Sequence, residues 1–186
     1  AGSAIYASGA NSVVSITNST ITANVNTMSS GAIYVSGAAV TLHNTVVAGN
    51  TGGNGSQITG KLSSSSSCNV IGVSTGLTGI VDGVGGNRIG AMGSPIDPLL
   101  GPLTDNGGPT RTHAPLPGSL LIDAGNDSRA VDAQGMPLRA DQRGWLRPFG
   151  TVDIGAVEVQ PPGLPLANDD GFVVDQDASI VIGVLA

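Results

Sequence analysis

The chain has 186 residues, which is enough for one domain with a substantial core. Its net charge of −6 at pH 7 argues against a nucleic-acid partner, and its apolar runs are too short to span a membrane. Because 40% of the residues are apolar, disorder is not expected, and the many Gly and small residues suit short strands joined by tight corners.

An internal repeat occupies the first part of the chain. The block Ile-Tyr-Ala-Ser-Gly at 5–9 returns as Ile-Tyr-Val-Ser-Gly at 33–37, and the block at 14–24 returns at 40–50. Both copies contain short stretches in which apolar residues alternate with polar or small ones. A repeat of this length built from short strands indicates a solenoid, and three strands per coil fit an all-β parallel β-helix. We expect its coils over residues 1–96, with a degenerate third coil between 57 and about 78.

Residues at equivalent positions of the two copies should stack on one another along the solenoid. Asn tolerates the left-handed geometry of corners and can hydrogen-bond along a ladder of like residues. The alternative is that these Asn residues bind a glycan or a metal. The expected ladders are Tyr6 with Tyr34, Asn18 with Asn44, and Asn24 with Asn50.

The distribution of charge argues against an enzyme. Polysaccharide lyases and hydrolases need carboxylates or a basic residue beside the sugar, but the first charge in this chain is Lys61 and the first acid is Asp82. His43 is the only titratable candidate in the first two coils, and His113 lies among prolines without an evident acidic partner. We therefore expect a noncatalytic protein.

Residues 97–158 form a second unit, which we expect to be an irregular C-terminal cap on the coils. Pro and Gly recur every few residues between 97 and 118, so the backbone must turn repeatedly. Short buried strands are expected at 120–122 and 152–157. We expect Asp141 and Arg143 to form a salt bridge with Asp123 or Asp153. The expected polar staples of the cap are Asp123, Asp141, Arg143 and Asp153.

The blocks around Asp97-Pro98, Asp123-Ala124-Gly125, Asp141-Gln142-Arg143-Gly144 and the stretch 152–158 occur in an order that resembles bacterial choice-of-anchor Q domains. The resemblance covers roughly residues 4–158. It implies a right-handed parallel β-helix belonging to a large secreted or cell-surface protein, and hence an extracellular location. It implies no chemistry.

The last part of the chain consists of a Pro-rich linker at 159–165 and a strand-forming tail at 166–186. The tail resembles the opening two strands of a cadherin-like or immunoglobulin-like repeat, but it is too short to bury a sandwich core. No cofactor is required. Calcium is considered because the tail offers hard oxygen ligands, the alternative being solvated turn carboxylates. These ligands are Asp169, Asp170, Asp175 and Asp177.

The sequence begins within a repeat and ends within an incomplete sandwich. One hypothesis is that the tail of one molecule adds as a strand to the open coil of the next, which would build a homopolymeric surface filament or sheath. The other is that the chain is a piece of a longer surface protein. The residues expected at the subunit interface are Phe172, Val173, Val174, Ile180, Val181, Ile182, Val184 and Leu185.

A second functional hypothesis is a carbohydrate-binding adhesin or a polysaccharide-degrading module that acts on surface glycans. An aromatic-lined or acidic groove would favour it. The sequence offers only Tyr6 and Tyr34 toward such a groove.

Overall fold

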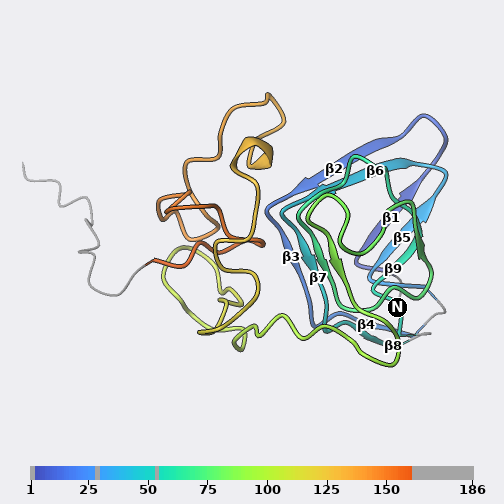
Figure 1. Cartoon of the computed structure of the whole chain (residues 1–186), viewed down its shortest axis with the longest axis horizontal. Helices are drawn as coiled ribbons and strands as arrows, with labels where there is room; N and C mark the ends of the chain where they lie inside the picture. The colour runs from blue at the N-terminus through green and yellow to red at the C-terminus, as the bar shows by residue number, and fades with distance from the viewer. Residues whose placement is uncertain (1–2, 28–29, 53–54, 161–186) are drawn as a thin grey trace, which may run out of the picture.

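The computed structural model describes residues 3–27, 30–52 and 55–160. The described strands form four parallel sheets stacked coil on coil, which confirms the predicted parallel β-helix (Figure 1). The strands are β1 (Ile5–Ser8), β2 (Val13–Thr17), β3 (Thr20–Ile21), β4 (Val25–Asn26), β5 (Ile33–Ser36), β6 (Ala39–His43), β7 (Val46–Val47), β8 (Thr51–Gly52), β9 (Ile58–Lys61), β10 (Val70–Ile71), β11 (Leu77–Thr78) and β12 (Arg88–Ile89). One 3-10 turn, η1 (Asp127–Arg129), is the sole helical element of this part of the chain. The expected interface and calcium residues of the tail lie outside the described residues.

The register of the first two coils follows the sequence repeat. Ile5 pairs with Ile33 in β1 and β5, and Val14 pairs with Val40 in β2 and β6. Each strand therefore lies beside its own equivalent one coil further along, as in-register parallel pairing requires. The two small strand pairs β3–β7 and β4–β8 complete these coils.

The stack continues for two further coils, which become shorter along the chain. Strands β9 and β10 form the third coil, and β11 and β12 form a fourth, which reaches beyond the end expected for the third coil and lies within the predicted range of coils, 1–96. Glycine makes the short coil feasible. Gly79 has φ +94, and a Cβ atom there would lie 2.0 Å from the Leu62 carbonyl oxygen, so no other residue fits between these coils.

The interior of the solenoid is a column of aliphatic side chains from successive coils. Alternate residues of each strand point inward, so the polar neighbours of these side chains face outward. The fully buried members include Ile33, Val40, Leu42, Ile58 and Leu62. Burial of each such side chain contributes roughly 1.5–3 kcal/mol, which makes this column the main stabilising element of the coils.

The cap docks on the outer face of the sheet β12–β10–β7–β3. Val47 and Ile71 face the solenoid core, whereas their neighbours Val46 and Val70 face outward and pack in a second cluster that includes cap residues such as Leu121. This sheet is consequently covered on both faces, which explains why its two central strands, β7 and β10, are continuous apolar pairs. Figure 1 shows the cap as the yellow-green to orange segment beside β3 and β7.

The two short strands expected within the cap are absent, and these predictions are wrong. Residues 120–122 lie in turns, because the Ser119 amide donates to the Leu116 carbonyl and the Ile122 amide donates to the Ser119 carbonyl. Residues 152–157 run through bends, and Gly155 has φ +111. Both segments use their backbone groups to attach to other parts of the molecule: the Ile154 amide donates to the Leu121 carbonyl at 2.9 Å.

Within the described part of the chain, no helix is long and apolar enough to cross a membrane.

Candidate functional site

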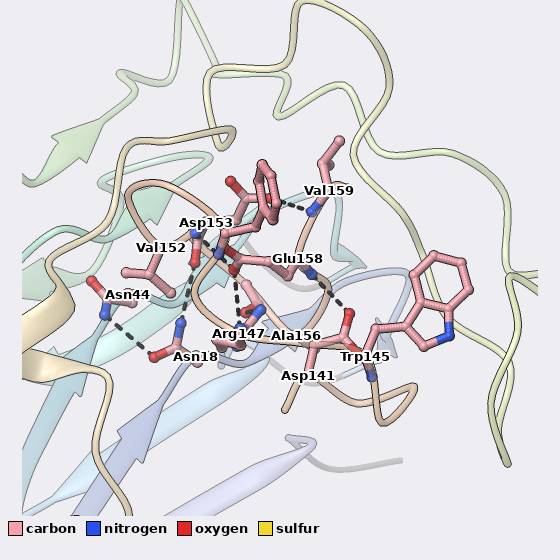
Figure 2. A network of polar contacts seen from close by, with 12 residues as sticks. Asn18, Asn44, Asp141, Trp145, Arg147, Val152, Asp153, Ala156, Glu158 and Val159 are labelled. Atoms are coloured by element: carbon pink, nitrogen blue, oxygen red, sulfur yellow. Dashed lines mark hydrogen bonds and ion pairs between the residues drawn. The ribbon is translucent and has the colours of Figure 1, made fainter. Parts of the chain in front are cut away.

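The asparagine corners join the coils to the cap. Asn18 and Asn44 have φ of 44° and 48°, the left-handed geometry that Asn tolerates better than most residues. The Asn44 Nδ2 atom lies 3.3 Å from the Asn18 Oδ1 atom, so the two side chains form a rung between coils. The Asn18 Nδ2 atom also donates to the carbonyl of Asp153 in the cap at 3.1 Å (Figure 2). These residues are therefore structural contacts for the cap.

The second asparagine pair forms its own ladder on another corner. The Asn24 Nδ2 atom donates to the Asn50 Oδ1 atom at 2.9 Å, and the Asn50 Nδ2 atom donates to the Gln57 Oε1 atom at 2.9 Å. A further ladder lies beside the first corner, where the Asn69 Nδ2 atom donates to the Asn87 Oδ1 atom at 2.9 Å. Sequence reasoning missed Gln57, Asn69 and Asn87 in these roles, because the later coils differ in length and no longer align by eye.

Tyr6 and Tyr34 stack with ring centroids 5.4 Å apart and an angle of 9° between the planes. The residue that follows Tyr34 in the next coil is Thr59, so this aromatic ladder has two rungs in the described coils. Two stacked rings on one edge stabilise the coil pair but do not form an aromatic-lined groove.

The centre of the cap is a buried ionic network. The Arg147 Nε atom lies 3.1 Å from the Glu158 Oε2 atom, and the Arg143 Nη2 atom lies 2.7 Å from the Asp141 Oδ2 atom. All four side chains are almost fully buried, which is rare for charges and requires that their hydrogen-bonding capacity be satisfied. Sequence reasoning missed Arg147 and Glu158. The sequence held one signal for this pair: Glu158 directly follows the largely apolar stretch 152–157. An acid that is buried with such a stretch needs a basic partner.

Asp141 organises one half of this network. Its carboxylate accepts hydrogen bonds from the backbone N–H groups of Arg143, Trp145 and Glu158, and from two guanidinium nitrogens of Arg143. The expected salt bridge from Arg143 or Asp141 to Asp123 or Asp153 is therefore wrong, because Arg143 folds back onto Asp141. The Arg143 guanidinium also lies 3.8 Å from the centroid of the Trp145 ring.

Glu158 and Asp153 organise the other half (Figure 2). Glu158 accepts from the amides of Phe149 and Asp153 as well as from Arg147. Asp153 accepts from the amides of Asp123 and Val159. Asp123 thus joins the network through its main chain, while its own carboxylate is exposed, which differs from the expectation that its side chain is a staple.

Burial disfavours the charged forms of the side chains in this network. It raises the pKa values of Asp153 and Glu158, and the backbone N–H donors act against that rise. It lowers the pKa of Arg147, which the nearby charge of Glu158 partly offsets. The hydrogen bonds that these carboxylates accept join separate segments of the cap to one another.

Neither histidine side chain forms a hydrogen bond with a side chain of this network. The His43 Nδ1 atom is 2.9 Å from the Ser67 Oγ atom on the next coil, and the His113 Nδ1 atom is 2.8 Å from the Gly101 carbonyl oxygen in the cap. Among the described residues, no group of three or more His, Cys, Asp or Glu side chains is arranged to hold a metal ion.

Fold and site together define the class of this protein as a β-solenoid of the parallel β-helix type that carries a docked, ionically stapled cap. Comparisons with protein-family models, with curated proteins and with solved structures found no match.

Proposed function

We propose that this chain is a noncatalytic structural protein of the cell surface, and that its first coil accepts a strand from residues 166–186 of a second copy. The observation that carries the proposal is the incomplete burial of the first coil. Repetition of the proposed contact from molecule to molecule would give a head-to-tail filament or sheath, because such a contact does not close on itself.

Equivalent residues of the first and second coils differ in burial although their sequences are similar. Val40 and Leu42 are fully buried, whereas Val14 and Ile16, one coil earlier, are only partly buried. The difference follows position in the stack, because within the described part of the chain each strand of the first coil has a strand partner on one side only.

The first coil also presents unpaired backbone groups. Strands β1 and β3 are the outermost strands of their sheets in the described chain, so each has one row of N–H and C=O groups without a strand partner. Such an edge readily accepts an added strand. Residues 180–182, Ile-Val-Ile, supply the kind of β-branched sequence that fits this role.

Two further features support a structural role at the surface. The buried carboxylates of the cap are engaged in hydrogen bonds that stabilise the fold. We also propose membership of the choice-of-anchor Q group on the strength of the sequence blocks at 97–158, and this resemblance supports an extracellular location.

The test is electron microscopy of the full chain beside three variants. The deletion of 164–186 removes the donor strand, and Val181→Pro removes a backbone N–H that strand pairing needs. Val181→Thr is the matched control, because Thr keeps a β-branched side chain and the N–H group. We expect filaments for the full chain and for V181T, and separate particles for the other two.

Two results would overturn the proposal. Separate particles in all four samples would show that the chain does not polymerise, as expected for a module whose first coil is covered by other segments of a longer protein. Filaments in all four samples would show that a different surface carries the assembly.

A further inference from the structure

An arm formed by residues 126–138 leaves the cap and lies beside the coils. Its base is fixed by Asn44, whose Oδ1 atom accepts from the Asn126 amide at 2.8 Å and whose Nδ2 atom donates to the Asn126 carbonyl at 3.0 Å. The arm folds back on itself, with the Leu138 amide donating to the Ala130 carbonyl at 2.8 Å. It begins with η1, which Figure 1 shows near the end of β2.

An open cleft of about 470 Å³ separates the arm from the outer face of β2 and β6. This volume lies in the range of small-ligand sites, roughly 300–1,000 Å³. The coils contribute a polar floor from outward-facing positions of the strands, and the arm contributes a wall that carries both charges and apolar side chains. The floor is formed by Ser15, Thr17 and His43, and the wall includes Ser128, Arg129, Val131, Asp132 and Leu138.

His43 presents a free ring nitrogen to this cleft. It faces outward from β6, yet it is only 9% exposed because the arm lies over it. Its Nδ1 atom is occupied by Ser67, and its Nε2 atom has no hydrogen-bond partner among the described residues. Since no fully buried side-chain nitrogen in that part of the chain lacks a partner, the Nε2 atom must be accessible. Burial lowers the pKa of His43, and the nearby charge of Arg129 adds to that lowering, so both favour the neutral ring.

Arg129 and Asp132 place opposite charges on the wall without pairing with each other. The Arg129 side chain forms no ion pair or hydrogen bond with another described residue, although two acids lie within three positions of it in the sequence. The Asp132 Oδ1 atom accepts from the amides of Gln134 and Met136, which leaves Oδ2 free to accept from a ligand. A ligand that engages both groups carries an anionic group for Arg129 and a hydrogen-bond donor, such as a hydroxyl, for Asp132.

We propose that this cleft binds a hexuronate residue of an acidic saccharide. The sugar carboxylate pairs with the Arg129 guanidinium, whose planar donors match a carboxylate in two-point contact. The sugar hydroxyls meet Asp132, the Nε2 atom of His43 and the hydroxyl groups of Ser15, Thr17 and Ser128. Val131 and Leu138 offer apolar contact to the C–H groups of the ring.

The mixed chemistry of the wall selects against other ligands. A neutral sugar brings no anionic group to Arg129, and a simple anion brings no hydrogen-bond donor to Asp132. This inference is independent of the filament proposal, because the cleft lies on the flank of the coils and not at the open edge of the first coil.

The test is isothermal titration calorimetry of the full chain with a panel of hexuronate trisaccharides. The comparison probes are the same trisaccharides with their carboxyl groups reduced to alcohols, and a triglutamate peptide. Because Arg129→Gln removes the charge and the two-point contact to the sugar carboxylate, it should weaken hexuronate binding by about tenfold or more. Arg111→Gln, which removes an equal charge from an exposed position elsewhere on the cap, is the matched control and should leave binding unchanged.

A second variant tests the role of the negative charge of Asp132. Asp132→Asn keeps the Oδ1 acceptor for the two arm amides but removes the carboxylate, and it should also weaken hexuronate binding. Circular dichroism of both variants should match the unaltered protein. The proposal is overturned if no hexuronate of the panel binds, if R129Q binds as tightly as the unaltered protein, or if triglutamate or the reduced sugars bind as tightly as the hexuronates.

Discussion

Asn44 and Asn126, which are 82 positions apart in the sequence, form a two-point hydrogen-bonded pair in which one side chain binds both backbone groups of the other residue. Asn44 is fully buried, and its backbone carbonyl also accepts from the Gly155 amide at 2.8 Å. A single corner residue of the second coil therefore fixes two separate segments of the cap.

The first prediction concerns this residue. Asn44→Gly keeps the left-handed backbone, which glycine adopts freely, but removes the side-chain contacts to Asn18 and Asn126. At about 1 kcal/mol for each hydrogen bond, we expect a loss of roughly 2–3 kcal/mol in the free energy of unfolding. Urea denaturation measures it. The control is Ala23→Gly, because Ala23 also has a positive φ of 56° but has no polar side chain to lose. Equal stability of the two variants would contradict the proposed role of Asn44.

The second prediction concerns the buried pair of Arg147 and Glu158. Glu158→Gln keeps the shape of the side chain but leaves the buried guanidinium without its counterion. Removal of one partner of a buried ion pair typically costs about 3–5 kcal/mol, so a loss of that size is expected in urea denaturation. Asp132→Asn is the control, because this carboxylate is exposed and its variant should stay within about 0.5 kcal/mol of the unaltered protein.

The double variant Arg147→Met with Glu158→Gln tests whether the loss comes from an unpaired charge. If it does, the double variant should be more stable than E158Q alone, because no uncompensated charge remains. A double variant less stable than the unaltered protein by the full sum of the E158Q and R147M losses would show instead that packing, and not charge, dominates at this site.

The third prediction concerns Gly125, which directly precedes the arm and packs closely against Val152. A Cβ atom on Gly125 would lie 2.6 Å from the Val152 carbonyl oxygen and 3.1 Å from the Asn44 Oδ1 atom. Gly125→Ala should therefore destabilise the protein by about 1–3 kcal/mol. Gly93 is the matched control, because its Cβ would meet nothing within 4 Å and neither glycine has a positive φ. Gly93→Ala should be neutral or stabilising by up to about 1 kcal/mol. Thermal unfolding of both variants measures the two effects.

The coils could be predicted from the sequence and the cap contacts could not, for a physical reason. In the coils, each residue lies beside its repeat equivalent, so the pairing of Val14 with Val40 is already present as an offset in the sequence. In the cap, Glu158 is bound by Arg147 and by the amides of Phe149 and Asp153, which share no spacing rule. In irregular backbone, the turns decide where the N–H donors lie, and no sequence pattern records those turns. A buried carboxylate therefore indicates from the sequence that it needs donors, but not which residues supply them.

The last prediction concerns pH and the lowered pKa of His43. Burial is the larger cause of the lowering, and the charge of Arg129 adds to it. Below the ordinary value of 6.5, the unfolded chain binds a proton at this histidine that the folded protein does not. The free energy of unfolding should therefore fall as pH decreases from 6.5 toward the folded pKa of His43.

The carboxylates of Asp153 and Glu158 act in the opposite direction. Their pKa values are raised in the fold, so the folded protein binds protons more readily than the unfolded chain, and their contribution to stability increases as pH decreases through that interval. The informative quantity is therefore the difference between two proteins. Urea denaturation from pH 7.5 to 5 (about one reading per half unit) should show that His43→Gln removes a destabilisation on acidification that the unaltered protein shows. His113→Gln removes the other histidine of the chain and should keep that destabilisation. Parallel curves for the unaltered protein and H43Q would show that His43 titrates alike in the folded and unfolded states, and that the arm does not shield it from water.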